Sequence, residues 1–227
     1  MKGFDNLLMY VLGYGLMVKE KRTDTEWKGL TAWFTQVINS FRGRVEHSRR
    51  YIVFSGGHVA DPMLSEAESM KAYALENKLL FKNQLYHSGI DDHPFNTTAG
   101  VLGALLRARL IWNVSMRKES VKLVIVCDKV RLPAVRATLF WLRFGTGVWC
   151  RPQIGVEVIA FERADIHVNS QPVRQWFKAL LYALPLVGWF LIERDLLESK
   201  ARFDGQRAIR QADWEEDQDS AAPESAS

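Results

Sequence analysis

The chain has 227 residues, of which 48% are hydrophobic and 25% charged. These values are ordinary for a soluble globular protein with one large domain or two small ones, and they leave ample material for a hydrophobic core. They exclude a chain that is disordered throughout.

The charge is unevenly distributed along the chain. Six acids and no base follow position 212, at Asp213, Glu215, Glu216, Asp217, Asp219 and Glu224. The preceding body therefore carries 30 basic and 20 acidic residues, a net charge of +10. Such a body can attract phosphates, nucleic acid or an anionic membrane surface. The last residues are acidic, rich in Ser and Ala and poor in apolar side chains. We therefore predict a single domain over 1–205 and an acidic disordered tail over 206–227.

The N-terminal stretch 1–21 combines apolar residues with features that argue against a signal peptide. Gly13 and Gly15 interrupt the apolar run, Asp5 precedes it, and no small-residue cleavage site follows. We interpret it as a first strand ending in a glycine turn. The two cysteines, Cys127 and Cys150, fit neither a metal spacing nor a disulfide framework, so we expect reduced thiols and a cytoplasmic protein.

Four short, continuous apolar runs are typical of interior strands in a parallel sheet; they cover 6–13, 51–56, 122–128 and 155–161. Stretches with helical periodicity separate them, at 25–41, 65–80, 96–112 and 133–145. Ser65 and Glu68 have the spacing of a capping box, and Pro133 stands near a predicted first turn. This alternation predicts an α/β fold of three layers, a mostly parallel sheet with helices on both faces.

The segment 172–205 contains fourteen uninterrupted apolar residues, Ala179 to Ile192. That is short of the roughly 18–20 residues that cross a bilayer. Pro185 and Gly188 also weaken it as one helix. We predict a pair of helices that closes the fold. The alternative is a helix in a membrane interface, with Trp176 and Trp189 at headgroup depth.

Ligands of parallel α/β sheets collect beyond the carboxyl ends of the strands. The first predicted strand ends near Gly13 and Gly15, the second at Ser55, Gly56 and Gly57, and the third at Asp128, followed by Arg131 and Arg136. About eight residues separate Gly57 from the next helix, where a plain connection needs about two to six. Glycines let the backbone approach an anion, and arginines can hold it, so these positions form a predicted site.

Each of these residues also has a structural explanation. The glycines could make tight turns, Asn96 or Thr97 could cap a helix, and Arg136 could be a solvated helix residue. The histidines have no second histidine at metal spacing, so we expect no metal site. Neither a phosphate-binding P-loop nor a dinucleotide fingerprint is present in the sequence.

The order of these short motifs resembles the YdcF-like family, which includes the bacterial envelope proteins SanA and ElyC. The matching residues, over about 5–165, are Ser55-Gly56-Gly57, Ser65-Glu66-Ala67 and Asn96-Thr97. The resemblance implies a Rossmann-like domain whose segment 57–65 forms a pocket wall with Glu66 turned inward. It also implies S-adenosylmethionine as a candidate nucleotide ligand and a role in cell-envelope metabolism.

The chain departs from the family pattern at three places. Pro94 occupies a Ser position, with Asp91 as the preceding acid, and Ala99-Gly100 replaces a Glu-Asn pair. Arg131 stands where the family tends to have His, which replaces a proton-exchanging group by a permanent cation. Binding without turnover is therefore favoured over catalysis, although both remain open.

Two functions follow from the sequence. The first is binding or conversion of a small anionic ligand, such as a nucleotide, a sugar-phosphate or a lipid-linked phosphate. Arg131 and Arg136 would hold the anion, and Glu66 or Asp128 would act as general base. The alternative is a non-catalytic accessory protein at the inner membrane face, attached through its C-terminal apolar segment and basic body. Nucleic-acid binding is disfavoured because the basic residues are scattered among acids. The oligomeric state stays open.

Overall fold

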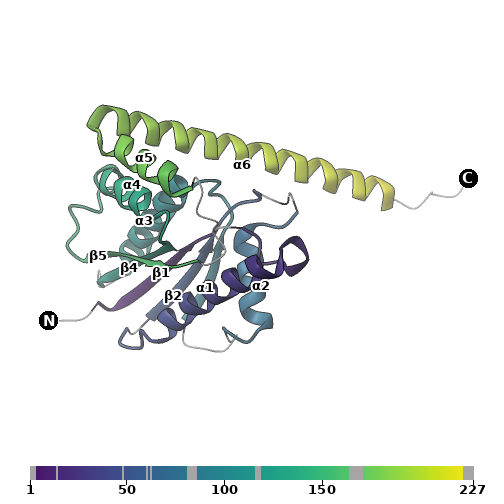
Figure 1. Ribbon diagram of the computed structural model, residues 1–227, viewed down its shortest axis with the longest axis horizontal. Helices are drawn as coiled ribbons and strands as arrows, with labels where there is room; N and C mark the ends of the chain where they lie inside the picture. Colours follow the sequence, from purple (N-terminus) through teal and green to yellow (C-terminus); the bar gives the residue numbers. More distant parts are fainter. Residues whose placement is uncertain are drawn as a thin grey trace, which may run out of the picture.

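The computed structural model describes residues 4–221 except 14, 48, 60, 62, 81–85, 116–118 and 164–170 (Figure 1). Five parallel strands form one sheet in the order β3-β2-β1-β4-β5. The strands are β1 (Asn6–Leu12), β2 (Arg49–Ser55), β3 (Tyr86–Asp91), β4 (Val121–Asp128) and β5 (Ile154–Phe161). This order reverses direction between β1 and β4, so the carboxyl ends of these two strands flank the switch point of the sheet.

Helices cover both faces of the sheet, which confirms the predicted three-layer, Rossmann-like α/β fold (Figure 1). One face carries α1 and α2, where Phe34 of α1 packs against Phe54 of β2 and Tyr73 of α2. The other face carries α3 and α4. The helices are η1 (Lys19–Lys21), α1 (Asp24–Arg42), α2 (Glu66–Glu76), α3 (Thr97–Val114), α4 (Leu132–Gly145), α5 (Gln171–Ala183) and α6 (Pro185–Ala221).

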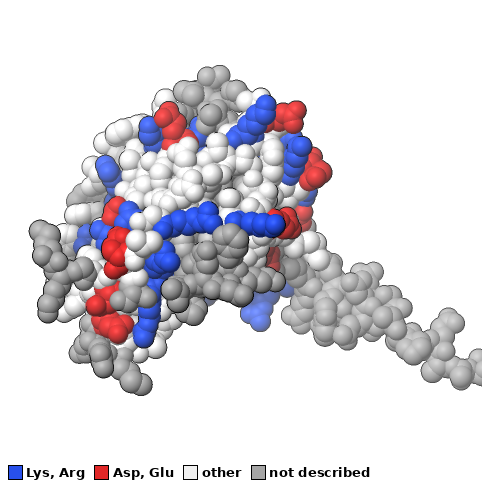
Figure 2. Space-filling view, turned by 90° about the horizontal axis from the view of Figure 1, so that it is seen from below, with Lys and Arg blue, Asp and Glu red and all other residues white. Residues whose placement is uncertain are grey.

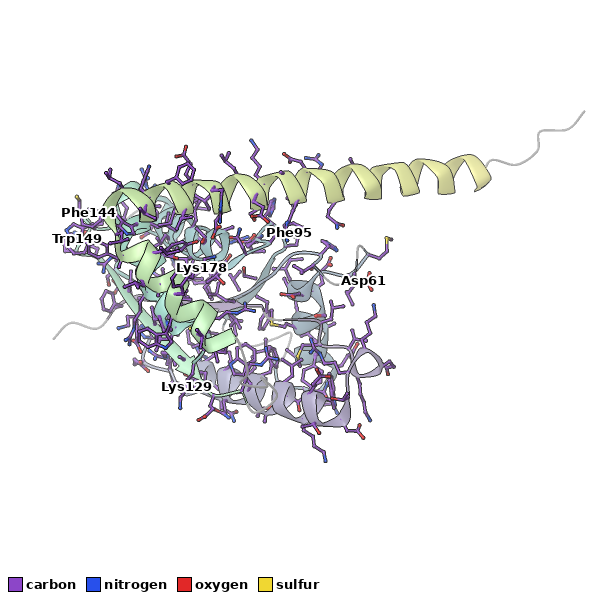
Figure 3. All side chains as sticks on the ribbon, turned by 45° about the horizontal axis from the view of Figure 1, so that its top comes forward. Asp61, Phe95, Lys129, Phe144, Trp149 and Lys178 are labelled. Carbon is purple, nitrogen blue, oxygen red and sulfur yellow. The ribbon has the colours of Figure 1, made fainter. Side chains whose placement is uncertain are left out.

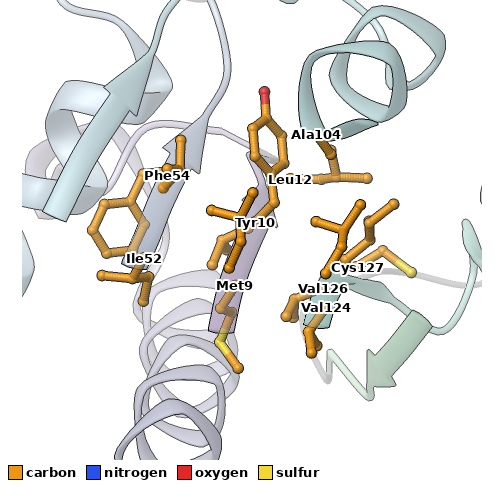
Figure 4. Close-up of a cluster of buried hydrophobic side chains, with 14 of the residues drawn as sticks. Met9, Tyr10, Leu12, Ile52, Phe54, Ala104, Val124, Val126 and Cys127 are labelled. Atoms are coloured by element: carbon orange, nitrogen blue, oxygen red, sulfur yellow. The ribbon is translucent and has the colours of Figure 1, made fainter. Parts of the chain in front are cut away.

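Four of the five strands coincide with the predicted apolar runs, and the central strand β1 is buried along its whole length. Alternation along this strand sends Tyr10 and Leu12 toward α3 and Met9 toward the opposite layer (Figure 4). The helix layers on both faces of the sheet therefore pack against side chains of β1. Each such large apolar side chain contributes about 1.5–3 kcal/mol when it is removed from water.

The fifth strand, β3, was missed from the sequence. Its residues Ser88 and Gly89 interrupt any apolar run, and its only neighbour is β2 because it lies at the sheet edge. Its last residue is fixed from the neighbouring layers: Asp91 accepts a hydrogen bond of 2.5 Å from the buried Tyr10 hydroxyl and one of 3.3 Å from Arg107 Nε. Tertiary contacts of this kind hold a strand that local sequence does not specify.

Helix starts follow the predicted capping signals. The predicted capping box is present at α2, where Ser65 accepts from the Glu68 backbone amide and Glu68 accepts from the Ser65 amide. A second capping box at Thr23 begins α1. Pro133 lies in the first turn of α4, as predicted. These caps fix where α2 and α4 begin, and therefore where the preceding loops end at the sheet edge.

The C-terminal segment forms the predicted pair of helices. α5 and α6 meet at Leu184, and α6 extends well past the body (Figure 1). Among the described helices none is by itself long and apolar enough to cross a bilayer. The pair Trp176–Ala183 and Leu186–Ala208 meets those criteria only jointly, with a bend of 118° between them.

The acidic segment 206–227 was predicted from its composition to be disordered. α6 continues through it to Ala221, and the last residues lie outside the described part of the chain. Ala, Glu, Gln and Arg are strong helix formers, so a segment of this composition can form a helix. A helix can therefore extend outward without an apolar face to bury.

Candidate functional site

A cavity of about 790 Å³ lies at the carboxyl rim of the sheet. Its floor consists of the ends of β1 and β2 and the starts of α2, α3 and α4, and its roof consists of α5 and α6. The lining residues from the floor include Leu12, Gly13, Gly15, Ser55, Gly56, Glu66, Phe95, Asn96, Thr97 and Arg131. Cavities of this size and position are typical of small-molecule sites in α/β proteins.

Most of the predicted site residues meet at this cavity. Eight of them line it: Gly13, Gly15, Ser55, Gly56, Glu66, Asn96, Thr97 and Arg131. Three do not. Gly57 packs against Phe95 behind the wall, Asp128 is buried beneath Arg131, and Arg136 is exposed on α4. The predicted ligand contacts of Gly57 and Arg136 therefore have no geometric support.

The glycines at the rim are required by close packing of the strand ends. A Cβ on Gly13 would lie 2.3 Å from the Ser55 carbonyl oxygen, which accepts a hydrogen bond of 2.5 Å from the Gly13 amide. Gly56 has φ +153°, and a Cβ there would lie 2.8 Å from the Glu66 side chain. Their absence of side chains creates the space into which Glu66 projects.

Glu66, the first residue of α2, supplies a buried carboxyl group at the cavity floor. The residue is 8% exposed. Burial raises the pKa of this carboxyl group, while Arg131, the Gly15 amide and Arg22 act in the opposite direction. A carboxyl group with a raised pKa can hold a proton and release it, which is the property required of a general acid or base.

Asp128 and Arg131 form a pair at the end of β4. The Arg131 amide donates to Asp128 Oδ1 at 2.9 Å, and Arg131 Nε lies 3.7 Å from Asp128 Oδ2. Asp128 is 1% exposed, and this burial raises its pKa although Arg131 opposes the shift. The carboxylate thus orients Arg131 from below. We assign it this positioning role, rather than the general-base role considered from the sequence, because it does not reach the cavity.

Asn96 has the capping role that the sequence left open. Its Oδ1 accepts from the Ala99 amide at 2.8 Å, which caps α3, and its Nδ2 donates to the Asp195 carbonyl oxygen of α6 at 2.6 Å. Thr97, the first residue of α3, lines the cavity beside it. The amide group of Asn96 is therefore occupied by protein contacts that attach the roof to the floor.

The roof contributes residues that sequence reasoning missed. Asp195 of α6 accepts hydrogen bonds from Lys178 Nζ at 2.7 Å, from Thr98 Oγ1 at 3.0 Å and from the Tyr182 hydroxyl. Burial alone would raise the pKa of Asp195, but these donors outweigh it and lower the pKa. Lys178 and Phe95 both line the cavity, and both are labelled below α6 in Figure 3. The available signal was the placement of Lys178 and Tyr182 on one side of α5, opposite its apolar residues.

Cationic and anionic side chains both face the cavity, along with an apolar wall. The cations are Arg131, Lys178, Arg194 and Arg202, and the anionic or titratable groups are Glu66, Asp195 and Glu198. Phe177, Leu181 and Leu191 supply apolar surface. Lys178 pairs with Asp195, and Arg202 with Glu198 at 2.5 Å. The described residues contain no group of three His, Cys, Asp or Glu side chains that could hold a metal ion.

Comparison with family models, curated proteins and solved structures finds no match to this chain. The fold and the cavity define a Rossmann-like α/β domain with a ligand-sized site at the carboxyl rim of its sheet.

Proposed function

We propose that this protein binds a small anionic ligand in the cavity at the carboxyl rim of its sheet. The observation that carries the proposal is the position of Arg131. It lines the cavity at the switch point between β1 and β4, with Asp128 fixing it from below. Open α/β sheets bind their ligands at this point.

The lining supports a ligand with both a charged and an apolar part. Guanidinium groups suit phosphate and carboxylate because they offer several donors in one plane. The amides of Gly13 and Gly56 donate to the Ser55 and Asp91 carbonyl oxygens, so the side chain of Arg131 rather than these amides would contact such a group. The apolar wall from α5 and α6 would cover the remainder of the ligand. A nucleotide, such as S-adenosylmethionine, a sugar-phosphate and a lipid-linked phosphate are the candidate classes, and the resemblance to the YdcF-like family supports a place in cell-envelope metabolism.

Binding is the activity that we propose, and turnover is a secondary possibility that depends on Glu66. This carboxyl group is the buried titratable side chain at the cavity floor with a raised pKa. In the proposed arrangement Arg131 would neutralise the anion and Glu66 would contact a neighbouring polar group of the ligand.

Thermal unfolding in the presence of candidate ligands tests the proposal. A ligand of the native state should raise the melting temperature by an amount that grows with the logarithm of its concentration. Arg131→Ala should weaken binding by about 10-fold or more, because a hydrogen-bonded charge is lost from the site. Arg136→Ala is the matched control. Arg136 lies in α4, the helix that Arg131 begins, but it is outside the cavity. Identical responses of wild type, Glu66→Ala and Arg131→Ala to nucleotides, sugar-phosphates and polyprenyl phosphates would refute it.

A further inference from the structure

Helix α5 carries its apolar residues on the outside. Val173, Trp176 and Leu180 follow helical spacing along one stripe, and each is at least 63% exposed. The opposite side of the helix faces the body and holds Ala179 and Tyr182, both buried, together with Lys178. A surface helix of a soluble domain normally has the reverse orientation, with the apolar stripe inside.

The apolar stripe continues past the bend into α6. Leu184, Trp189 and Phe190 are exposed. Leu186 is 89% exposed and lies at the bend between α5 and α6, which we call the elbow. The 118° bend between the two helices makes this elbow the projecting part of the pair. The stripe is therefore not covered by its own helical partner.

The end of α4 extends the same surface. Gly145 lies against Trp189: a Cβ atom added to this glycine would be 3.6 Å from the Trp189 ring. The half-exposed rings of Phe144 and Trp149 stack at 4.8 Å beside the elbow, and Phe140 packs on Phe144 (Figure 3). We call this surface the outer apolar face; it consists of Phe140, Phe144, Trp149, Val173, Trp176, Leu180, Leu184, Leu186, Trp189 and Phe190.

The segments that build the outer apolar face are basic. Residues 129–156 and 166–192 contain no Asp or Glu, whereas Arg136, Arg143 and Arg151 belong to the first of them, as does Lys129, which pairs with Glu162 at 2.9 Å. Arg143 lies over the Trp149 ring, 4.9 Å from its centroid. By contrast, the described part of the face in Figure 2 shows basic and acidic side chains side by side around a largely uncharged centre. The outer apolar face thus combines exposed Trp, Phe and Leu side chains with neighbouring Arg residues.

We propose that the outer apolar face docks on the surface of a lipid bilayer that contains anionic lipids, with α5 and the elbow lying in the interface. Trp and Phe rings and aliphatic side chains enter the headgroup and upper acyl region, while Arg and Lys pair with lipid phosphates. A second copy of the chain is a poorer occupant, because a two-fold interface would bring two basic surrounds together with no acid in either segment to pair them. The inference is independent of the ligand in the cavity.

Flotation of the full chain with vesicles tests the proposal. Wild type should float with vesicles of phosphatidylcholine and phosphatidylglycerol in equal parts, and less with phosphatidylcholine alone. Leu186→Ser combined with Phe190→Ser should reduce the bound fraction by about tenfold or more. The matched control is Val45→Ser with Met63→Ser, two residues of similar exposure far from this surface, which should float like wild type. Both variants should keep the wild-type circular dichroism spectrum, because all four side chains are exposed.

Three results from flotation and from the oligomeric state would overturn the proposal, and a fluorescence measurement supplies a fourth. The first is failure of wild type to float with anionic vesicles, and the second is equal flotation of the two double variants. The third is a dimer of wild type that the Leu186 and Phe190 changes dissociate without any effect on flotation, because the occupant would then be a second copy. Quenching of tryptophan fluorescence by brominated phosphatidylcholine in wild type provides a readout that needs no variant: contact with acyl chains predicts quenching, and its absence contradicts the inference.

Discussion

Glu66 illustrates how far one residue can be understood from the sequence. Its motif neighbours Ser65 and Ala67 marked the position, and Ser65 also announced a helix start. The inward direction of Glu66 depends on Gly13 and Gly56, which leave room for the carboxyl group at the rim. The sequence proposed both Arg131 and Arg136 as anion contacts and left open that Arg136 is a solvated helix residue; Arg136 lies outside the cavity. Side-chain direction at a helix start is decided by the phase of the helix, which composition does not reveal.

The raised pKa of Glu66 predicts a pH-dependent stability difference. The folded state holds this proton to higher pH than the unfolded chain does, so Glu66 costs stability progressively as pH rises through its folded-state pKa. Glu66→Gln removes the charge at all pH values. The melting temperature of Glu66→Gln minus that of wild type should therefore increase from pH 4 to pH 8. The increase should be about 2–4 °C for each kcal/mol of difference in the free energy of unfolding.

Glu76→Gln is the control for that pH series. Glu76 ends the same helix in an exposed position, so its difference from wild type should change little with pH. Equal pH profiles for the two variants would mean that burial does not perturb Glu66.

At the scale of elements, periodicity predicted every strand whose apolar run is continuous and every helix that covers the sheet. It failed for β3, where Ser88 and Gly89 replace apolar residues and the Tyr10–Asp91 contact supplies the missing information. The continuation of α6 to Ala221 has no apolar periodicity to reveal it, because its helix-forming residues need no core. The pair α5 and α6 was predicted, but its attachment to α3 through Asp195 could not be, because the partners lie 97 and 99 positions apart.

Asp195 should be the main polar anchor of α6. Asp195→Asn keeps the shape of the side chain and removes the charge that Lys178, Tyr182 and Thr98 share. We expect a loss of about 1.5–3 kcal/mol in the free energy of unfolding at neutral pH, measured by urea denaturation. The lowered pKa of Asp195 means that this contribution is present above the pKa of the unfolded chain and is lost as pH falls through the folded-state pKa.

Asp204→Asn on the exposed side of the same helix serves as the reference for Asp195→Asn. It should leave the free energy of unfolding within about 0.5 kcal/mol of wild type, as surface substitutions usually do. An Asp195→Asn variant as stable as Asp204→Asn would show that the attachment of α6 does not depend on this carboxylate.

The cavity combines floor residues that the order of motifs in the sequence indicated with roof residues of α5 and α6 that it did not. The floor follows from parallel strands, because their carboxyl ends must meet at one edge of the sheet. The roof follows from the packing of α5 on α4 and of α6 on α3, which turns Lys178 and Tyr182 inward and leaves the apolar stripe outside. One pair of helices thus closes the cavity with one side and presents the outer apolar face with the other.

Native mass spectrometry of the purified full chain tests the central claim most directly. The account predicts that wild type and Arg136→Ala retain the same small molecule with an anionic group, and that Arg131→Ala loses it. Retention of that molecule by Arg131→Ala at the wild-type level would contradict the account.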